Sequence, residues 1–218
     1  MAKSSWYRRA LAVLGACVGL FLLTSQSRAD GVSFDSPTGD IGSTTHTYTL
    51  DGISIVATAF NGGDLFGKNS GLGEQGVGLA ADPTGQHEIF ATTGTQDFIQ
   101  LDLLNLINAG FTNFEFQMGS TTGAETWQVT ACSTAGVLGS GPCAANAFTE
   151  TGSTETIQTA PGNLSATNHF LDFSSLNGNV LLGQIAATPA VPEPSSFMLL
   201  LTGIVALAGI FVLKGRPV

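Results

Sequence analysis

Basic residues are scarce in this chain. Its 218 residues include 7 Lys and Arg against 16 Asp and Glu, which gives a formal net charge of -9. Nucleic-acid binding depends on clustered Lys and Arg that neutralise phosphates, so the composition argues against a nucleic-acid partner. A long disordered acidic tail is excluded as well, because 43% of the residues are hydrophobic and can supply a core.

The few basic residues are concentrated at the two ends of the chain. Residues 1–29 contain four of them and no acid, and the tail contains Lys214 and Arg216. Residues 30–191 hold a single base, Lys68, and 15 acids, a net charge of -14. The chain is therefore expected to consist of two terminal segments around an acidic middle.

The N-terminal segment has the three parts of a secretory signal peptide. Basic residues precede an apolar run at 11–23, and Ser27-Arg28-Ala29 follows, with small residues where signal peptidase requires them. The sequence predicts a signal peptide over 1–29 that signal peptidase cuts between Ala29 and Asp30. Two alternatives are a retained anchor, although the run is shorter than the ~20 residues of a span, and lipidation at Cys17, although apolar residues continue beyond it.

The C-terminal segment has a comparable construction. Val191-Pro192-Glu193-Pro194 precedes an uncharged apolar run over 197–213 and a basic tail over 214–218. A helix over that run would be about 25 Å long, enough for a thin bilayer. Because basic residues flank a span on its cytoplasmic side, the sequence predicts a single C-terminal transmembrane helix with the acidic middle outside. A buried core helix fits less well, because the run has no polar face.

These three C-terminal parts resemble the PEP-CTERM sorting signal of Gram-negative bacteria, also known as the C-terminal domain of some ice-binding proteins. The resemblance covers 191–218 and departs from the family in the tail, where a run of arginines is reduced to Lys214 and Arg216. It implies processing near Pro192-Glu193-Pro194 by an exosortase, a membrane cysteine peptidase. The implied route is export, an inner-membrane intermediate, and then the cell surface or the extracellular matrix with its exopolysaccharide.

The acidic middle, residues 30–190, alternates short apolar and polar stretches. Asp51-Gly52 is a strong hairpin signal between predicted strands at 45–50 and 53–58. In Thr112–Met118 every second residue is apolar, as in a strand with one buried face. Further strands are expected at 76–80, 88–92, 98–103, 126–131, 169–173 and 179–186, and a short helix only at 103–109. The spacing predicts an all-β ectodomain, a β-sandwich of the jelly-roll type.

Two cysteines, Cys132 and Cys143, remain once the signal peptide is removed. The ten residues between them include three glycines and a proline. An even pair across a flexible loop in an oxidising compartment predicts a disulfide, and loop-closure entropy gives such a bridge about 3 kcal/mol of stabilisation. A metal site on the cysteines finds no support in the sequence, which has no CxxC motif and no histidine cluster.

Motifs of the common catalytic sites are missing. The sequence has no Gly-x-Ser-x-Gly, no His-Glu-x-x-His and no phosphate-binding glycine loop. His46, His87 and His169 stand apart and are expected to be ordinary residues of strands or strand edges. A secreted hydrolase would need paired acids or a nucleophile beside an oriented histidine, so it is the least favoured alternative. We expect no enzymatic activity and no organic cofactor.

Acidic residues in a glycine-rich stretch are a candidate metal site. Ca2+ prefers carboxylate and carbonyl oxygens from loops, so a calcium site competes with simple solvation of these acids. The candidate ligands are Glu74, Asp82, Glu88 and Asp97.

The expected role of the chain is that of a non-catalytic protein of the cell surface or the exopolysaccharide. The alternative is a carbohydrate-binding module, with or without Ca2+. Trp127 and Tyr48 are the candidate exposed aromatic residues for contacts with sugar rings.

Overall fold

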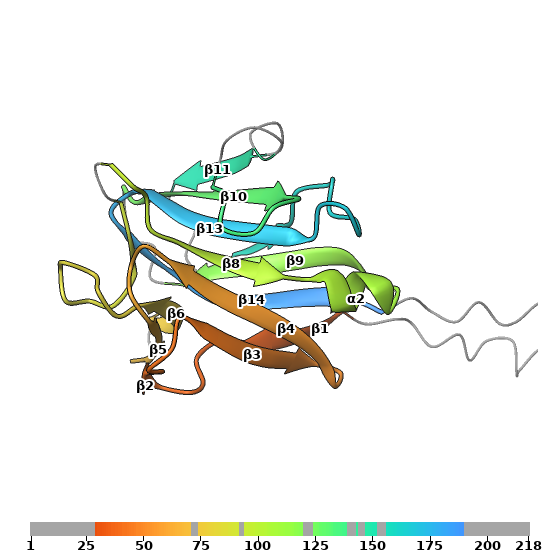
Figure 1. Cartoon of the computed structure of the whole chain (residues 1–218), viewed down its shortest axis with the longest axis horizontal. Helices are drawn as coiled ribbons and strands as arrows, with labels where there is room; N and C mark the ends of the chain where they lie inside the picture. The colour runs from red at the N-terminus through yellow and green to blue at the C-terminus, as the bar shows by residue number, and fades with distance from the viewer. Residues whose placement is uncertain are drawn as a thin grey trace, which may run out of the picture.

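The computed structural model describes two antiparallel sheets that share one core (Figure 1). The strands of the first sheet are β1 (Asp30–Ser33), β2 (Gly39–Asp40), β5 (Leu65–Asn69), β6 (Gln75–Leu79), β7 (Ile89–Phe90), β9 (Thr112–Gly119), β12 (Ile157–Thr159) and β14 (Asn179–Thr188). The second sheet consists of β3 (Thr45–Leu50), β4 (Ile53–Phe60), β8 (Phe98–Asp102), β10 (Thr126–Cys132), β11 (Ala147–Thr151) and β13 (Phe170–Asn177). The residues described are 29–70, 74–91, 94–119, 124–138, 143, 147–151 and 156–189.

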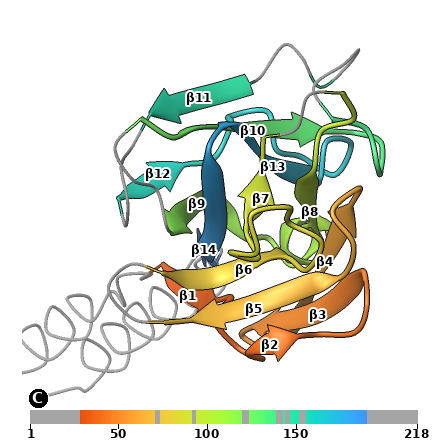
Figure 2. The ribbon, with the colours of Figure 1, turned by 90° about the vertical axis from the view of Figure 1, so that its left-hand side faces the viewer.

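The strand order of each sheet brings together segments that are distant in the sequence. The first sheet runs β12-β9-β14-β6-β5-β2, with β1 and β7 also paired to β14. The second runs β11-β10-β13-β8-β4-β3. Figure 2 shows the same two sheets from one end of the strands. The prediction of an all-β domain is confirmed.

Local sequence signals explain several elements. Asp51 and Gly52 have positive φ angles of 51° and 78°, which suit the tight turn that sets Leu50 opposite Ile53 in the β3–β4 hairpin. The expected short helix is present as α2 (Leu104–Asn108). Strands β1, β2, β5, β11 and β12, none longer than five residues, were not expected from the sequence.

The alternation in β9 fits the core. Phe114, Phe116 and Met118 are buried, and the polar residues between them are at least partly exposed, as predicted. The side chain of Phe116 packs against the second sheet. Its ring lies edge-on to Phe173 and to Trp127, with centroids 5.3 and 5.7 Å away. Such aromatic pairs contribute about 0.5–1.5 kcal/mol beyond the burial of their area.

Both ends of the described fold lie at one end of the sheets. β1 runs antiparallel to β14, with Asp30 opposite Ala187. α2 lies at this end, which we call the near end, and the loop from β6 to β7 lies at the opposite, far end (Figure 1). The predicted cleavage position at Ala29 and Asp30 therefore lies beside the last residues of β14.

The predicted terminal segments fall outside the described residues. They include most of the signal peptide, 1–28, and the sorting segment with Val191, Pro192, Glu193, Pro194, Lys214 and Arg216. Within the described ranges, no helix has the length and apolar character to cross a membrane. The predicted span at 197–213 is outside those ranges.

Candidate functional site: a buried carboxyl under a disulfide-closed loop

A loop after β10 covers the outer face of the second sheet. In this covering loop, residues 133–138, the main-chain N–H of Gly136 donates to Gln100 Oε1 at 3.2 Å. Gly136 has φ of 72°, and a Cβ there would lie 2.9 Å from the Phe60 ring, so glycine is required. Phe60 in turn stacks on Phe98 at 4.6 Å. The covering loop therefore buries the outer face of β8, whose other face lies in the core.

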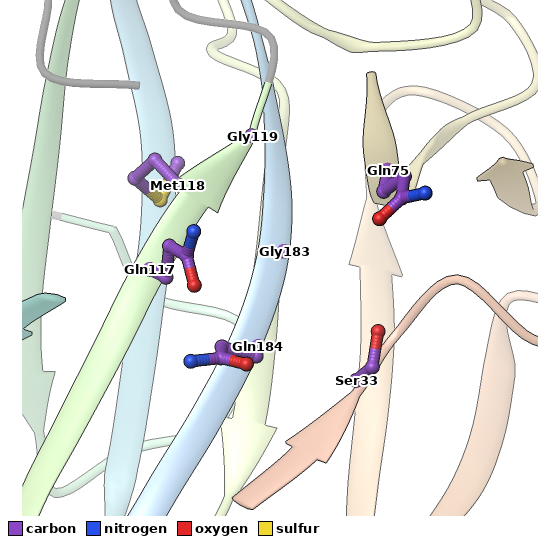
Figure 3. A pocket seen from close by; sticks show the side chains of 7 residues that line it. All are labelled: Ser33, Gln75, Gln117, Met118, Gly119, Gly183 and Gln184. Carbon is purple, nitrogen blue, oxygen red and sulfur yellow. The ribbon is translucent and has the colours of Figure 1, made fainter. Parts of the chain in front are cut away.

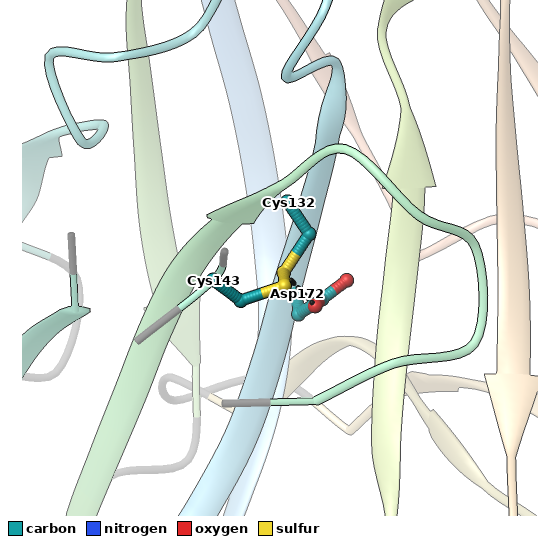
Figure 4. A group of neighbouring side chains, drawn as sticks. All are labelled: Cys132, Cys143 and Asp172. Carbon is teal, nitrogen blue, oxygen red and sulfur yellow. Dashed lines mark hydrogen bonds between the residues drawn. A yellow bond between two sulfur atoms is a disulfide. The ribbon is translucent and has the colours of Figure 1, made fainter. Parts of the chain in front are cut away.

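Cys132 and Cys143 join the two sides of this loop. Their sulfur atoms lie 2.20 Å apart and their Cα atoms 4.6 Å apart, so the predicted disulfide is present (Figure 4). Both cysteines have no exposed surface. The bridge closes the chain back onto the end of β10 and holds the covering loop in place.

Asp172 of β13 lies beneath the disulfide, with no exposed surface. Its Oδ1 accepts a hydrogen bond from Gln100 Nε2 at 2.7 Å, and its Oδ2 lies 2.9 Å from Cys132 Sγ. Burial raises the pKa of Asp172 to about 7, although hydrogen bonds from Gln100 and Thr130 favour the charged form. This carboxyl therefore titrates near neutral pH.

Gln100 connects the covering loop to the carboxyl. Because its Oε1 accepts from the N–H of Gly136, its amide nitrogen faces Asp172. The orientation of the side-chain amide is thus fixed from both sides. A change in the covering loop would reach Asp172 through this residue.

The carbonyl of Val137 completes the surroundings of the sulfur atoms. Its oxygen lies 3.5 Å from Cys132 Sγ and 3.6 Å from Cys143 Sγ. Among the described residues, Cys132, Cys143 and Asp172 form the single group of three metal-binding side chains whose ligand atoms lie within 4.8 Å of one another. Sequence spacing did not reveal Asp172 or Gln100; the one available signal was a polar residue within the otherwise apolar start of β13.

Comparison with known proteins does not help to interpret the site. The chain matches no known protein family, no curated protein and no solved structure. Its chemistry rests on the residues themselves: a proton-binding carboxyl, two sulfur atoms and a carbonyl oxygen, all enclosed by the covering loop.

The predicted calcium ligands form two pairs, which meet where the main-chain N–H of Glu88 donates to Asp82 Oδ2 at 3.3 Å. Glu74 and Glu88 both approach Lys68, whose Nζ lies 3.0 Å from Glu74 Oε2 and 2.5 Å from Glu88 Oε1. Burial lowers the pKa of Lys68, but the hydrogen bonds to Glu88 and Glu74 outweigh this effect and leave it raised. The ammonium group, which stays protonated, therefore offsets one of the two negative charges of these carboxylates.

Asp82 and Asp97 are the second pair. Asp82 accepts from the N–H and Oγ1 of Thr84, at 2.8 and 2.7 Å, and so stabilises a turn at the far end. Burial, and then the negative charge of Asp82, raise the pKa of Asp97. The four acids are not gathered at one point among the described residues, and calcium binding stays a prediction.

A small polar pocket opens on the outer face of the first sheet (Figure 3). β6 and β1 pair with β14 along the same edge, β6 at Leu182 and β1 from Gln184 onward, and the pocket lies between them. Its volume is about 70 Å³. The lining residues are Ser33, Gln75, Gln117, Met118, Gly119, Gly183 and Gln184.

The prediction that Trp127 and Tyr48 are exposed aromatic residues is wrong. Trp127 is fully buried and Tyr48 is 5% exposed, because both side chains point into the core. The three histidines lie apart: His46 in β3, His87 stacked on Phe66 at 4.0 Å, and His169 just before β13. Of these, only His46 is in a strand; His87 has φ of 61° in the loop before β7.

Proposed function

We propose that this chain is an exported, non-catalytic protein of the cell surface or its exopolysaccharide, sorted through its PEP-CTERM segment. The observation that carries the proposal is the pairing of Asp30 with Ala187. It sets the predicted cleavage position beside the last residues of β14 at the near end, a few residues before the sorting segment begins in the sequence. Both terminal segments thus join the fold at one place.

The boundaries of the fold fit this arrangement. Cleavage after Ala29 would make Asp30, the first residue of β1, the new N-terminus. β14 ends at Thr188, shortly before Val191. A domain held in the membrane by its C-terminal segment would carry its far end outward. The partners in this proposal are signal peptidase, an exosortase, the membrane and the exopolysaccharide.

We also propose a jelly-roll arrangement for the two sheets. Its support is a nested pairing: β9 pairs with β14 in the first sheet, and the next strands inward, β10 and β13, pair in the second. β11 and β12 follow at the outer edges of the two sheets. This nesting is typical of a long hairpin wrapped across a sandwich.

The sorting proposal is tested by replacing Pro192, Glu193 and Pro194 with alanine in an exosortase-containing host. We expect unprocessed precursor in the membrane fraction, seen as a higher mass on immunoblots. The matched control replaces Ser195 and Ser196 with alanine and should be processed normally. If the triple variant has the mass and location of the wild type, the proposal fails.

A carbohydrate-binding module is the second candidate, and the polar pocket is the observation that favours it. Amide side chains donate and accept hydrogen bonds, as sugar hydroxyls require. Without an exposed Trp127 or Tyr48, these amides would provide the contacts. Retention on immobilised polysaccharides, with and without Ca2+, should be reduced by Gln117→Ala and Gln184→Ala. No retention of the wild type under either condition would exclude this candidate.

A further inference from the structure

We propose that Cys132 and Cys143, once reduced, form with Asp172 and the Val137 carbonyl a binding site for a thiophilic divalent cation such as Zn2+. The side chains of Cys132, Cys143 and Asp172 lie together and are fully buried (Figure 4). This site does not depend on the proposed sorting function.

The positions of four atoms carry the proposal. In a tetrahedral site with metal–sulfur bonds of about 2.3 Å and metal–oxygen bonds of about 2.1 Å, sulfur and oxygen ligands lie about 3.6 Å apart. Val137 O already lies 3.5 and 3.6 Å from the two sulfur atoms. Asp172 Oδ2 is at 2.9 Å from Cys132 Sγ, so a small side-chain rotation completes the set when the sulfur atoms separate.

Gln100 acts as the outer partner that a metal-binding carboxylate requires. Its Nε2 holds Oδ1 of Asp172, while Oδ2 faces Cys132 Sγ. The Gly136 N–H holds Gln100 in this orientation. Such outer partners typically change metal affinity 10–100-fold when they are removed.

The kind of ligand determines the kind of cation. Two thiolates favour Zn2+ and similar soft or borderline ions, whereas Ca2+ takes 6–8 oxygen ligands. The sequence gives no sign of this site, because Asp172 lies outside the stretch of chain that supplies Cys132, Val137 and Cys143. The fold adds the third ligand from β13 and the fourth from the main chain of the covering loop.

Reduction and binding are two balanced steps. A dithiol reductant gives two electrons and two protons to the S–S bond, becomes a disulfide itself, and leaves two protein thiols. Metal binding then forms two metal–sulfur and two metal–oxygen bonds, displaces water from the metal ion, and releases the two thiol protons and any proton held by the Asp172 carboxyl. The disulfide and the metal are therefore alternative ways to close the same loop.

The test measures Co2+ binding to the full-length chain in mild detergent, in a Cys17→Ser background that serves as the wild type, so that Cys132 and Cys143 are its two thiols. A phosphine is the reductant, because it competes for metal less than a dithiol does. We expect reduced wild type to bind one Co2+ per chain with a sulfur-to-cobalt charge-transfer band, which Zn2+ abolishes by displacing Co2+. The oxidised chain should bind none at this site. A reduced chain without this band overturns the proposal, whether or not circular dichroism shows it folded.

Variants separate the ligands from their surroundings. Cys143→Ser should abolish high-affinity binding, and Asp172→Asn should weaken it at least about tenfold while the charge-transfer band remains. Gln100→Leu should weaken it by about 10–100-fold without removing a ligand. Asp51→Asn, in the exposed β3–β4 turn, is the matched control and should bind as wild type. Unchanged affinity in Cys143→Ser or Asp172→Asn overturns the assigned ligand set.

Discussion

The outer faces of the two sheets differ, although the sheets share one core. On the first sheet, Gln117 and Gln184 stay partly exposed beside the polar pocket. On the second sheet, Gln100, Asp172 and Ser174 also alternate with core residues, yet they are buried. At Gln100 and Asp172, the covering loop and the disulfide make the difference. A polar residue on the outer face of a strand is thus solvated or buried according to what the rest of the chain places over it.

The largest expected effect comes from the core that both sheets share. Trp127 is fully buried and contacts Phe116 of the opposite sheet. Trp127→Ala should lower the free energy of unfolding by about 3–5 kcal/mol, because it leaves a large cavity. Urea denaturation monitored by circular dichroism measures this. Ile157→Ala, at a residue 58% exposed, should stay within about 0.5 kcal/mol of wild type. Equal losses of unfolding free energy in Trp127→Ala and Ile157→Ala would contradict a core shared by the two sheets.

The second effect is a pH dependence specific to the covered face. The pKa of Asp172 is about 7 in the folded chain, whereas an unfolded aspartate titrates near ~3.9. Between these values the folded state holds a proton that the unfolded state has released. The free energy of unfolding therefore falls as pH rises. The contribution of Asp172 is fully present below about pH 4, and on the order of 4 kcal/mol of it is lost by about pH 7.

Denaturation of wild type and Asp172→Asn from pH 4 to pH 8 measures this dependence. The difference between the two curves isolates Asp172, since the other acids contribute to both. An acid on the open face, introduced by Gln184→Glu, should produce no such slope. If the wild-type and Asp172→Asn curves run parallel, the carboxyl does not titrate as its burial requires.

Removing the disulfide should affect the two faces unequally. Replacing Cys132 and Cys143 with serine should cost about 3 kcal/mol of unfolding free energy. Hydrogen exchange should rise in the covering loop and in the outer residues of β8 and β13. The amides of β6 and β14 beside the polar pocket should exchange as in wild type. Uniform loss of protection in both sheets would contradict a local role of the covering loop.

Sequence patterns predicted the strands and turns that depend only on residues close together in the sequence. The Asp51-Gly52 turn and the alternation in β9 depend on neighbouring residues, and both are present in the structure. β2 consists of two residues and β12 of three, both at sheet edges. Such short strands exist because a partner strand pairs with them, so the sequence of the strand alone cannot predict them.

For the same reason, the sequence predicted the two cysteines of the candidate site but not its carboxyl. Cys132 and Cys143 stood out because a glycine-rich loop separates them. Asp172 did not, because it looks like any polar residue on the solvent side of a strand. Sequence spacing likewise did not show that Lys68 of β5 lies between Glu74 and Glu88. Calcium binding at the four acids stays a prediction.

The smallest expected effect is the difference in stability between two substitutions to alanine, one on each outer face. Ser174 Oγ is buried and has no hydrogen-bond partner in the described structure. An unpaired buried hydroxyl destabilises the fold, so Ser174→Ala should raise the free energy of unfolding by about 1 kcal/mol. Gln184→Ala, on the open face, should change it by less than about 0.5 kcal/mol. Urea denaturation at pH 5 measures both. A loss of stability in Ser174→Ala would mean that the hydroxyl has a hydrogen-bond partner in the folded chain.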